Sequence, residues 1–283
     1  MAERLNYQTS LEQISSVLSQ RERQLLETYT SLSITEASAI GSTLESMGFV
    51  KCEAGPVLMG SDNGLVCSIE GRRGNETPGR EFYLDSFYIA KTTVTNGGFE
   101  EFDPRHKRTT TSPGDRHPVT CVTYGRAISY TLWLREKTGL KFCLPTEPQL
   151  TKAMAPYGWH YPYQEKGAPT RRGQNVYKSY PELYPLQESG STLEVDNPAV
   201  PVNYLGIHHP TGNVSVFTLG HYTTQGHWGA QSDGTYVVAM GGNFRLCPLS
   251  ARVASRGIMD VTGLGDTVGI RLIHPDPANY VAK

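Results

Sequence analysis

Glycine and proline recur so often along this chain that long uninterrupted helices and strands are excluded over most of its length. Its 283 residues include 29 glycines, 18 prolines and 16 tyrosines. Glycine adopts backbone conformations that other residues avoid, and proline cannot donate a backbone hydrogen bond, so both concentrate in turns and loops. The sequence therefore predicts a loop-rich protein and excludes a helical bundle. At this length about three-quarters of the unfolded surface can be buried, which permits a substantial core.

Residues 1–48 differ from the rest because they carry helical spacing. Apolar residues recur at intervals of three, four or seven, at Leu11, Ile14, Leu18 and Leu25. Ser33 and Glu36 form a capping box that predicts a second helix, with Gly48 as its end. The apolar face of that helix comprises Ala37, Ile40, Leu44 and Met47. We expect both helices to pack on the main domain or on a neighbouring subunit, and to serve oligomerisation or attachment to a larger assembly.

From residue 49 onward the sequence predicts short strands, short helices and long loops. Residues 81–95 alternate apolar and polar side chains as a half-buried strand pair does. A helix is expected over 123–139, and Thr146 with Gln149 three residues later predicts the start of another. Strands are expected within 234–244 and 268–273, whereas little regular structure is expected over 157–212. The glycine pairs at 97–98 and 241–242 indicate sharp turns.

Charge and composition exclude several classes of partner. The net charge is −1, so the chain has no bulk attraction for nucleic acid or for an anionic membrane. No segment approaches the roughly 20 apolar residues of a membrane helix, and the N-terminus lacks the apolar run of a secretory signal. Five widely spaced cysteines argue against a disulfide framework. We therefore expect a cytoplasmic protein or a component of a virus particle.

Six segments then occur in an order that resembles the formylglycine-generating enzyme (sulfatase-modifying factor) family. They are GPVLMGSDNG, YIAKTTVTNGGFEEFDP, the stretch 117–150, NYLGIHHPTGNVSVF, GGNFRLCPLSARVASR and GIRL. The resemblance runs from about residue 49 to residue 273. It implies a variant C-type lectin fold, which is one loop-rich α+β domain over 49–283, preceded by the N-terminal helical segment 1–48.

The family is functionally divided, so the resemblance alone does not give the function. Some members oxidise a substrate cysteine to formylglycine with copper that two cysteines hold. Others act in peptide maturation or sulfoxide synthesis. A further group binds ligands, including retroelement-diversified and phage variable proteins, whose ligand surface begins at the double glycine.

The copper site of the family is incomplete in this sequence. Cys247 falls within one residue of the first copper cysteine, but the second should lie near Ala251 or Arg252, and no cysteine follows Cys247. The remaining four, Cys52, Cys67, Cys121 and Cys143, match no copper position. A single thiolate cannot provide the two-sulfur coordination that suits Cu(I). We therefore expect no copper-dependent oxidation and interpret Cys247 as a small apolar residue.

The calcium site of the family is also altered. The resemblance places an aspartate at the position of His209 and a glutamate at that of Val216, and both carboxylates are lost here. Asn203 and Asn213 remain as oxygen donors. We expect calcium to be absent or bound only weakly near these two asparagines, with Asn213 making turn hydrogen bonds instead.

The histidines predict no transition-metal site. His208, His209, His221 and His227 fit no helical or finger spacing, and no carboxylate lies among them before Asp233. We expect these imidazoles to hydrogen-bond to the backbone or to stack on aromatic rings. His106 and His117 are interpreted as structural or surface residues. No Walker loop, dinucleotide-binding motif or G-x-S-x-G elbow is present.

The segment from Asn243 to Thr267 is the candidate ligand-binding region. Its predicted contact residues are Phe244, Arg245, Leu246, Leu249, Ser250, Arg252, Asp260, Thr262 and Asp266, with Thr267 completing a polar rim. An aromatic and an arginine among small residues suit the recognition of a protein or a carbohydrate. Arg256 and Arg271 are expected to donate to loop carbonyls inside the domain.

Our first hypothesis is a non-catalytic ligand-binding protein, such as a retroelement-diversified variable protein or a phage receptor-binding component. A second hypothesis is an oxidase of a peptide or secondary metabolite, which requires a deep cleft lined by titratable residues. A third is a structural subunit, in which segment 243–267 is buried against another chain.

Overall fold

The computed structural model describes the chain in segments that include most of the region after residue 19. These segments are residues 19–60, 76, 79–159, 161–165, 168–170, 190–221, 234–246 and 248–282. The helices are α2 (Gln20–Leu26), α3 (Ile34–Ser46), α4 (Asn96–Glu100), α5 (Tyr124–Thr138) and α6 (Glu147–Met154), with 3-10 helices η1 (Pro248–Ala251) and η2 (Pro277–Tyr280). Among the described helices, none combines the length and hydrophobicity needed to cross a lipid bilayer.

The helix starts that the sequence predicts are confirmed by their caps. The Ser33 hydroxyl accepts a hydrogen bond from the backbone N–H of Glu36, and the Glu36 carboxylate accepts one from the backbone N–H of Ser33, so α3 begins with the expected capping box. The Thr146 hydroxyl and Gln149 cap α6 in the same way. Helix α5 ends at Gly139, which adopts the left-handed conformation (φ 73°) that favours glycine.

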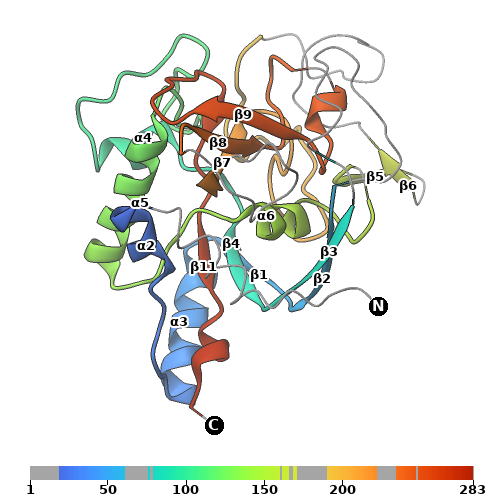
Figure 1. Cartoon of the computed structure of the whole chain (residues 1–283). Coiled ribbons are helices and arrows are strands. Elements are labelled where there is room, and N and C mark those ends of the chain that lie inside the picture. Colours follow the sequence, from blue (N-terminus) through green and yellow to red (C-terminus); the bar gives the residue numbers. More distant parts are fainter. Residues whose placement is uncertain are drawn as a thin grey trace.

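Within the described residues, the strands form two larger sheets and two hairpin-like pairs (Figure 1). The three-stranded sheet has the order β1-β4-β11, and the four-stranded sheet has the order β10-β7-β8-β9. β2 pairs with β3, and β5 pairs with β6. The strands are β1 (Phe49–Cys52), β2 (Gly55–Met59), β3 (Arg80–Leu84), β4 (Phe87–Ala90), β5 (Tyr163–Glu165), β6 (Ala168–Thr170), β7 (Ser215–His221), β8 (Tyr236–Met240), β9 (Arg256–Asp260), β10 (Val268–Gly269) and β11 (Ile273–Pro275).

Three local predictions need correction. The two strands expected within 81–95 exist as β3 and β4, but they belong to different sheets and do not pair. The strand expected over 268–273 is divided between β10 and β11, which also lie in different sheets. The glycines at 97 and 98 lie inside α4 and not in a sharp turn, because Thr95 caps that helix by accepting from the Gly98 backbone N–H at 3.0 Å.

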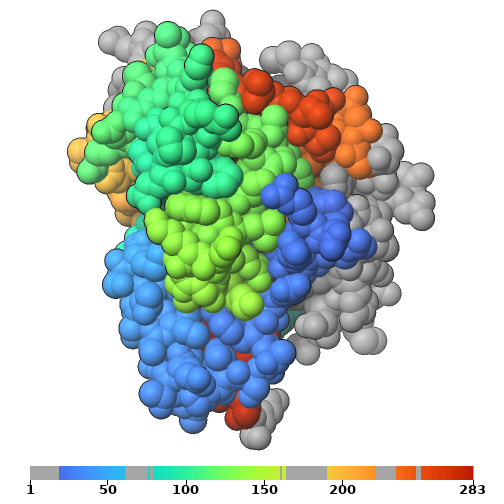
Figure 2. Space-filling view, turned by 90° about the vertical axis from the view of Figure 1, so that its left-hand side faces the viewer, coloured from blue at the N-terminus to red at the C-terminus, as the bar shows by residue number. Residues whose placement is uncertain are grey.

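The N-terminal helices pack on the main domain, which is one of the two arrangements expected for them. α2 contacts α5, while α3 contacts β1 and η2 near the other end of the chain. Figure 2 shows this face, with α3 below α5 and α2 beside it. Leu25 of α2 and Leu44 of α3 are buried in the same apolar core as Phe49, so the helical segment shares the core of the domain. The predicted helix positions Leu11, Ile14 and Leu18 lie outside the described residues.

The apolar core includes side chains of α6 and of both larger sheets. Leu150 of α6, Phe217 of β7 and Met240 of β8 are almost completely buried within it. β4 is central to the three-stranded sheet, where Ile89 lies opposite Val50 on one side and Ile273 on the other. This arrangement holds the segment after β8, which contains the candidate site, against a rigid base.

Candidate functional site

The candidate segment leaves β8 through the expected double-glycine turn. Gly241 and Gly242 have φ angles of 91° and 65°, a region that L side chains rarely occupy. A Cβ atom on Gly242 would lie 2.7 Å from the carbonyl oxygen of Ser250, which is closer than atoms can approach. The turn therefore requires glycine and lies against Ser250 and Ala251, at the end of η1.

Two asparagine contacts then fix the segment to the core. The Asn243 side chain donates to Ser215 Oγ at 3.1 Å and accepts from the Arg245 backbone N–H at 3.1 Å. The Phe244 backbone N–H donates to the Asn213 carbonyl at 3.0 Å. These bonds pair polar groups that would otherwise be buried without partners. The start of the segment is consequently anchored and not a free loop.

The prediction that Phe244 projects from the surface is wrong. Its side chain is only 3% exposed. The guanidinium carbon of Arg245 lies 5.4 Å from the centre of the Phe244 ring, so the arginine covers it. Burial of a phenyl ring stabilises the fold, and the double-glycine turn directs this ring inward. Phe244 is a structural residue of the segment.

Arg245 and Leu246 are exposed, as the sequence predicts. The Arg245 side chain is 53% exposed and pairs with Asp266 at 2.5 Å. Leu246 is 38% exposed, and Leu264, two residues before Asp266, is 67% exposed. An ion pair flanked by two exposed leucines offers both charge and apolar area to a partner. We call Arg245, Leu246, Leu264 and Asp266 the surface residues.

Sequence reasoning missed Leu264, although its context carried a signal. It stands between Gly263 and Gly265 in a turn that follows β9. A large apolar residue between two glycines at a turn has little neighbouring surface to cover it. The same turn contains the predicted Asp260 and Thr262, which are exposed. Hydrogen bonds from the Thr262 side chain and backbone lower the pKa of the Asp260 carboxyl.

The prediction that Arg252 contacts a ligand at the surface is also wrong. Its side chain is 3% exposed and forms a bidentate ion pair with Glu76 at 2.8 and 3.0 Å. Two planar nitrogens and two carboxylate oxygens satisfy each other, and the pair joins the candidate segment to the stretch before β3. Ser250 is half-buried. The side chain of Leu249 and residue Cys247 lie outside the described parts of the structure.

Arg256 and Arg271 are buried inside the domain, as expected, but they have different kinds of partner. Arg271 donates to the carbonyls of Ala90, His208 and His209 at 2.8 to 3.1 Å, which confirms the prediction for this residue. Arg256 instead forms a buried ion pair with Glu147 in the first turn of α6, at 2.6 and 2.8 Å. Asn243, Phe244, Arg252 and Arg256 therefore support the surface from beneath, and we call them the frame residues.

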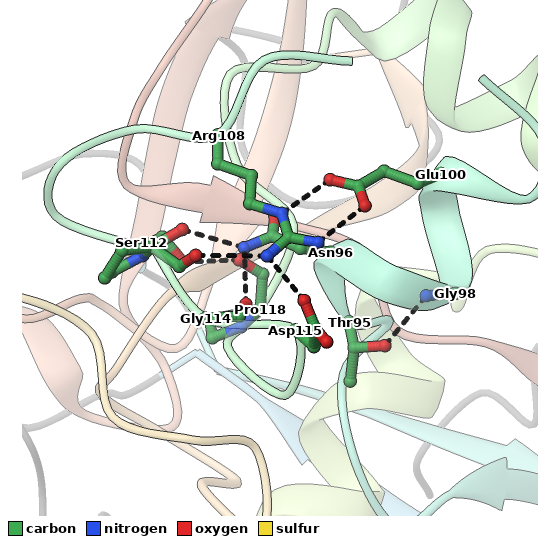
Figure 3. A network of polar contacts seen from close by, with 10 residues as sticks. Thr95, Asn96, Gly98, Glu100, Arg108, Ser112, Gly114, Asp115 and Pro118 are labelled. Carbon is green, nitrogen blue, oxygen red and sulfur yellow. Dashed lines mark hydrogen bonds and ion pairs between the residues drawn. The ribbon is translucent and has the colours of Figure 1, made fainter. Parts of the chain in front are cut away.

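A polar network holds the loop before Val119 in place beside this region (Figure 3). Asn96 donates to the carbonyls of Ser112 and Gly114 at 2.7 and 3.0 Å. Arg108 pairs with Glu100 and with Asp115, both at 2.6 Å. The loop continues to Cys121, whose backbone N–H donates to the Gly265 carbonyl at 3.0 Å, and so it supports the turn that carries Leu264.

At the altered calcium positions, the remaining asparagines already have protein partners. Asn203 donates to the carbonyls of Ala153 and Met154 and accepts from two backbone N–H groups. Asn213 exchanges two hydrogen bonds with the backbone of Leu193, so its side chain bridges segments that are distant in the sequence. His209, in place of the family aspartate, is buried, and burial lowers its pKa to about 4.

The described histidines have structural surroundings. His106 meets the Phe99 ring edge to face at 5.2 Å, and His117 bonds to the Thr192 hydroxyl at 2.8 Å. Burial lowers the pKa of both imidazoles. Within the described segments, no group of three or more His, Cys, Asp or Glu side chains could hold a metal ion. The side chain of His221 and residue His227 lie outside those segments.

The two buried thiols of the described residues, those of Cys52 and Cys143, are poorly suited to redox chemistry. Burial raises the pKa of Cys52 to about 11 and that of Cys143 to about 12. A thiol is a nucleophile or a metal ligand in its ionised form, so both remain unreactive near neutral pH. At the positions expected for the second copper thiol, Ala251 is completely buried and Arg252 is ion-paired.

A pocket of about 350 Å³ lies away from this surface, between β2 and α6. Its walls include the rings of Tyr157, Trp159 and Tyr204, and the side chains of Thr151 and Lys152 also line it. Sequence reasoning missed this site. The cluster of aromatic residues after α6 is visible in the sequence, but its position beside β2 depends on the fold.

The loop-rich α+β architecture, with helices around small sheets, defines the class of the protein as the C-type lectin-like fold of formylglycine-generating enzymes. The sequence matches the family described as the sulfatase-modifying factor enzyme 1-like domain over residues 37–275, and the chain belongs to that family. The match begins inside α3. The predicted family and fold class are thereby confirmed.

Three solved structures resemble the chain over 80% of its length. PvdO from Pseudomonas aeruginosa is 22% identical, with a TM-score of 0.65 and 94% of its own chain covered. CarF is 17% identical, with a TM-score of 0.57 and 97% covered. Treponema denticola variable protein 1 is 15% identical, with a TM-score of 0.61 and 94% covered. At these identities the likeness establishes the fold. No curated protein sequence matches the chain.

Proposed function

We propose that this protein is a non-catalytic ligand-binding protein that recognises a protein or carbohydrate with the surface formed by Arg245, Leu246, Leu264 and Asp266. The observation that carries the proposal is the contrast within one segment between these surface residues and the buried frame residues. A rigid base lowers the entropic cost of binding, because the contact residues are already positioned. Asp260 and Thr262 add hydrogen-bonding groups at the edge.

The chemistry of the copper positions supports this proposal. An oxidase of the formylglycine type needs two thiolates, whereas the sequence offers only Cys247 in this region. Ala251 and Arg252 are already used in packing and in an ion pair. The fold is also that of Treponema denticola variable protein 1, and a role as a retroelement-diversified or phage receptor-binding protein is part of the proposal.

Glycan-array and protein-display screening with the purified full chain, followed by a substitution series, tests the proposal. We expect Arg245→Glu and Leu264→Ser each to weaken binding of any ligand found by at least about tenfold, because both alter central contact residues. Lys137→Glu is the matched control, since Lys137 lies on α5, outside the segment, and forms an exposed ion pair with Glu101.

Three results would contradict the proposal. Ligand binding that is unchanged by both surface substitutions would place the site elsewhere. Stoichiometric copper uptake with oxygen-dependent turnover of a peptide or metabolite would instead establish the enzymatic alternative. A stable complex in which segment 243–267 is buried against a structural partner would favour the third alternative, a subunit of an assembly.

A further inference from the structure

Three aromatic rings line the pocket between β2 and α6 at its exposed side. Tyr157 and Tyr204 are about half exposed, and Trp159 is half-buried. Elsewhere in the protein rings pack on one another, as Phe99 and Tyr130 do at 5.3 Å. Among the described residues, the three rings of the pocket have no such ring partner. The exposed faces of the two tyrosines are therefore accessible to a ligand.

The two tyrosines are held in place by their hydroxyl groups. Tyr204 donates to the Lys152 carbonyl at 2.6 Å, and Tyr157 donates to the Glu81 carboxylate on β3 at 2.6 Å. Since both hydroxyls already have partners, each tyrosine offers its ring and not its phenol group to a ligand. A ring that is already positioned loses little conformational entropy when a ligand packs on it. Figure 1 shows α6 beside the β2–β3 pair, where this pocket lies.

The charges in and beside the pocket balance. Lys51, Lys152 and Glu53 line it, and Asp276 lies next to it as the partner of Lys51. Lys51 is 3.0 Å from the Asp276 carboxylate and 3.6 Å from the Glu53 carboxylate. Two ammonium groups are thus matched by two carboxylates, which gives neither an anion nor a cation an electrostatic advantage. The balance favours a ligand without net charge.

Polar groups of the pocket have unused hydrogen-bonding capacity. An ammonium has three donors, and the contact of Lys152 Nζ among the described residues is a long one, with the Pro56 carbonyl at 3.4 Å. The Glu53 carboxylate is mostly exposed and has the 3.6 Å contact with Lys51. The indole N–H of Trp159 makes no hydrogen bond among the described residues. The pocket therefore offers donors and acceptors together.

Sugars combine the properties that these groups require. A hydroxyl both donates and accepts, so an uncharged ligand with several hydroxyls can bond to an ammonium and a carboxylate at once. A pyranose ring also has a face of C–H groups, which can pack on an aromatic ring as other apolar groups do. A flat apolar ligand would instead cover Lys152 without pairing its ammonium, which costs free energy.

We propose that this pocket binds an uncharged saccharide. A C–H face of a pyranose ring lies on Tyr157 and Tyr204, and its hydroxyls bond to Lys152, Glu53 and Trp159. A volume of about 350 Å³ lies within the range of small-molecule sites and excludes a large cofactor. This site is separate from the C-terminal surface and does not depend on the function proposed for it.

Saturation-transfer NMR of the full chain with the methyl pyranosides of glucose, galactose, mannose and N-acetylglucosamine tests this site. We expect at least one of them to bind, with the strongest transfer at the ring C–H protons that face the tyrosines. Methyl glucuronide is a probe that adds one carboxylate, and p-cresol is a flat apolar probe with a single hydroxyl. Neither should bind more tightly than the best uncharged sugar, because the charges balance and the polar groups need several hydroxyls.

Substitution of one ring tests the stacking. Tyr157→Ser should weaken binding of that sugar at least about tenfold, whereas Tyr157→Phe, which keeps the ring, should retain it. Tyr236→Ser is the matched control, because Tyr236 on β8 is 43% exposed, close to the 52% of Tyr157, and lies outside the pocket. Each Tm should stay near that of the unaltered protein, since both side chains are largely exposed.

Substitution of the ammonium tests the polar contacts. Lys152→Met keeps the apolar stem and should weaken sugar binding about tenfold, because hydrogen bonds to a charged group are lost. Lys137→Met on α5 and Arg245→Glu on the C-terminal surface should leave it unchanged.

Four results would overturn the proposal. They are the failure of every uncharged pyranoside to bind, tighter binding of methyl glucuronide or p-cresol than of any such sugar, unchanged binding in both Tyr157→Ser and Lys152→Met, and loss of binding in Arg245→Glu. The last result would place the sugar on the C-terminal surface, so the two sites are distinguished by the same series.

Discussion

Two ion pairs in the same C-terminal segment differ in burial and therefore in what they do. Arg256 and Glu147 are both almost completely buried, and their bond joins β9 to the first turn of α6. Arg245 and Asp266 are accessible to solvent and join two loops. A buried pair that loses one member leaves a charge without neutralisation, whereas an exposed charge is solvated by water. The buried pair of Arg256 and Glu147 therefore stabilises the fold, whereas the charges of Arg245 and Asp266 are accessible to a binding partner.

The largest effect is expected at the buried pair. Glu147→Ala removes the carboxylate that neutralises Arg256 and should lower the free energy of unfolding by about 3 kcal/mol or more. Urea denaturation measures this change. Glu101→Ala, which breaks the exposed pair with Lys137, is the control and should cost less than about 1 kcal/mol. Equal losses in the two variants would remove the distinction between buried and exposed pairs.

A comparable loss is expected when the buried ring of the segment is removed. Phe244→Ala should lower the free energy of unfolding by about 3 kcal/mol, because it leaves a cavity where a ring is packed. Leu264→Ala should change it by less than about 0.5 kcal/mol, because that side chain is mostly exposed. Thermal or urea unfolding of the two variants compares them directly. A small effect of Phe244→Ala would restore the sequence-based prediction of a displayed ring.

Acid should destabilise the folded protein through its buried histidines. Burial holds the pKa of His209 at about 4, and that of His274 at about 4 as well, below the value near 6.5 of an unfolded chain. Between these values the unfolded state binds protons that the folded state does not. Stability from these groups is therefore complete above about pH 6.5 and falls as the pH decreases toward about 4.

Each of these two histidines should contribute up to about 3 kcal/mol to that loss. His209→Gln should therefore roughly halve the part of the pH dependence that the pair causes, as measured by urea unfolding between these pH values. Asp260, an exposed group, is the comparison, and Asp260→Asn should leave the same slope nearly unchanged. A pH profile that His209→Gln does not alter would mean that this imidazole is solvated in the folded protein.

The smallest effect on stability is expected at the exposed pair itself. Arg245→Ala should change the free energy of unfolding by no more than about 1 kcal/mol, since exposed ion pairs contribute little. Its effect on ligand binding, if the proposed function holds, should be much larger than its effect on the Tm. A variant that loses stability and binding together would indicate that Arg245 belongs with the frame residues.

Local features of this fold were predictable because their causes lie within a few residues. The caps of α3 and α6 depend on a hydroxyl and on a side chain three positions later, and the turn at Gly241 and Gly242 depends on backbone freedom. The family and its fold followed from the order of six motifs. The lack of a second copper cysteine is likewise a property of the sequence.

Pairing between distant segments was not predictable in the same way. Residues 81–95 contain two strands as expected, yet their partners come from β1, β2 and β11. Arg245 and Arg252 are both arginines of the same segment. The side chain of Arg252 is buried and pairs with Glu76, whereas that of Arg245 is exposed and pairs with Asp266. The backbone N–H of Phe244 donates to the carbonyl of Asn213, thirty-one positions earlier, so the burial of this ring involves a segment that is distant in the sequence.

The sequence by itself determined the helix caps, the glycine turns, the family and the absence of paired copper thiols, because each is a matter of residue type at a fixed spacing. Only the tertiary structure decided which side chains of 243–267 are exposed, and only it brought Glu53 and Lys152 to the pocket beside β2. Burial and ion pairing depend on which residues the fold brings into contact, and the spacing of residues along the sequence does not specify those contacts.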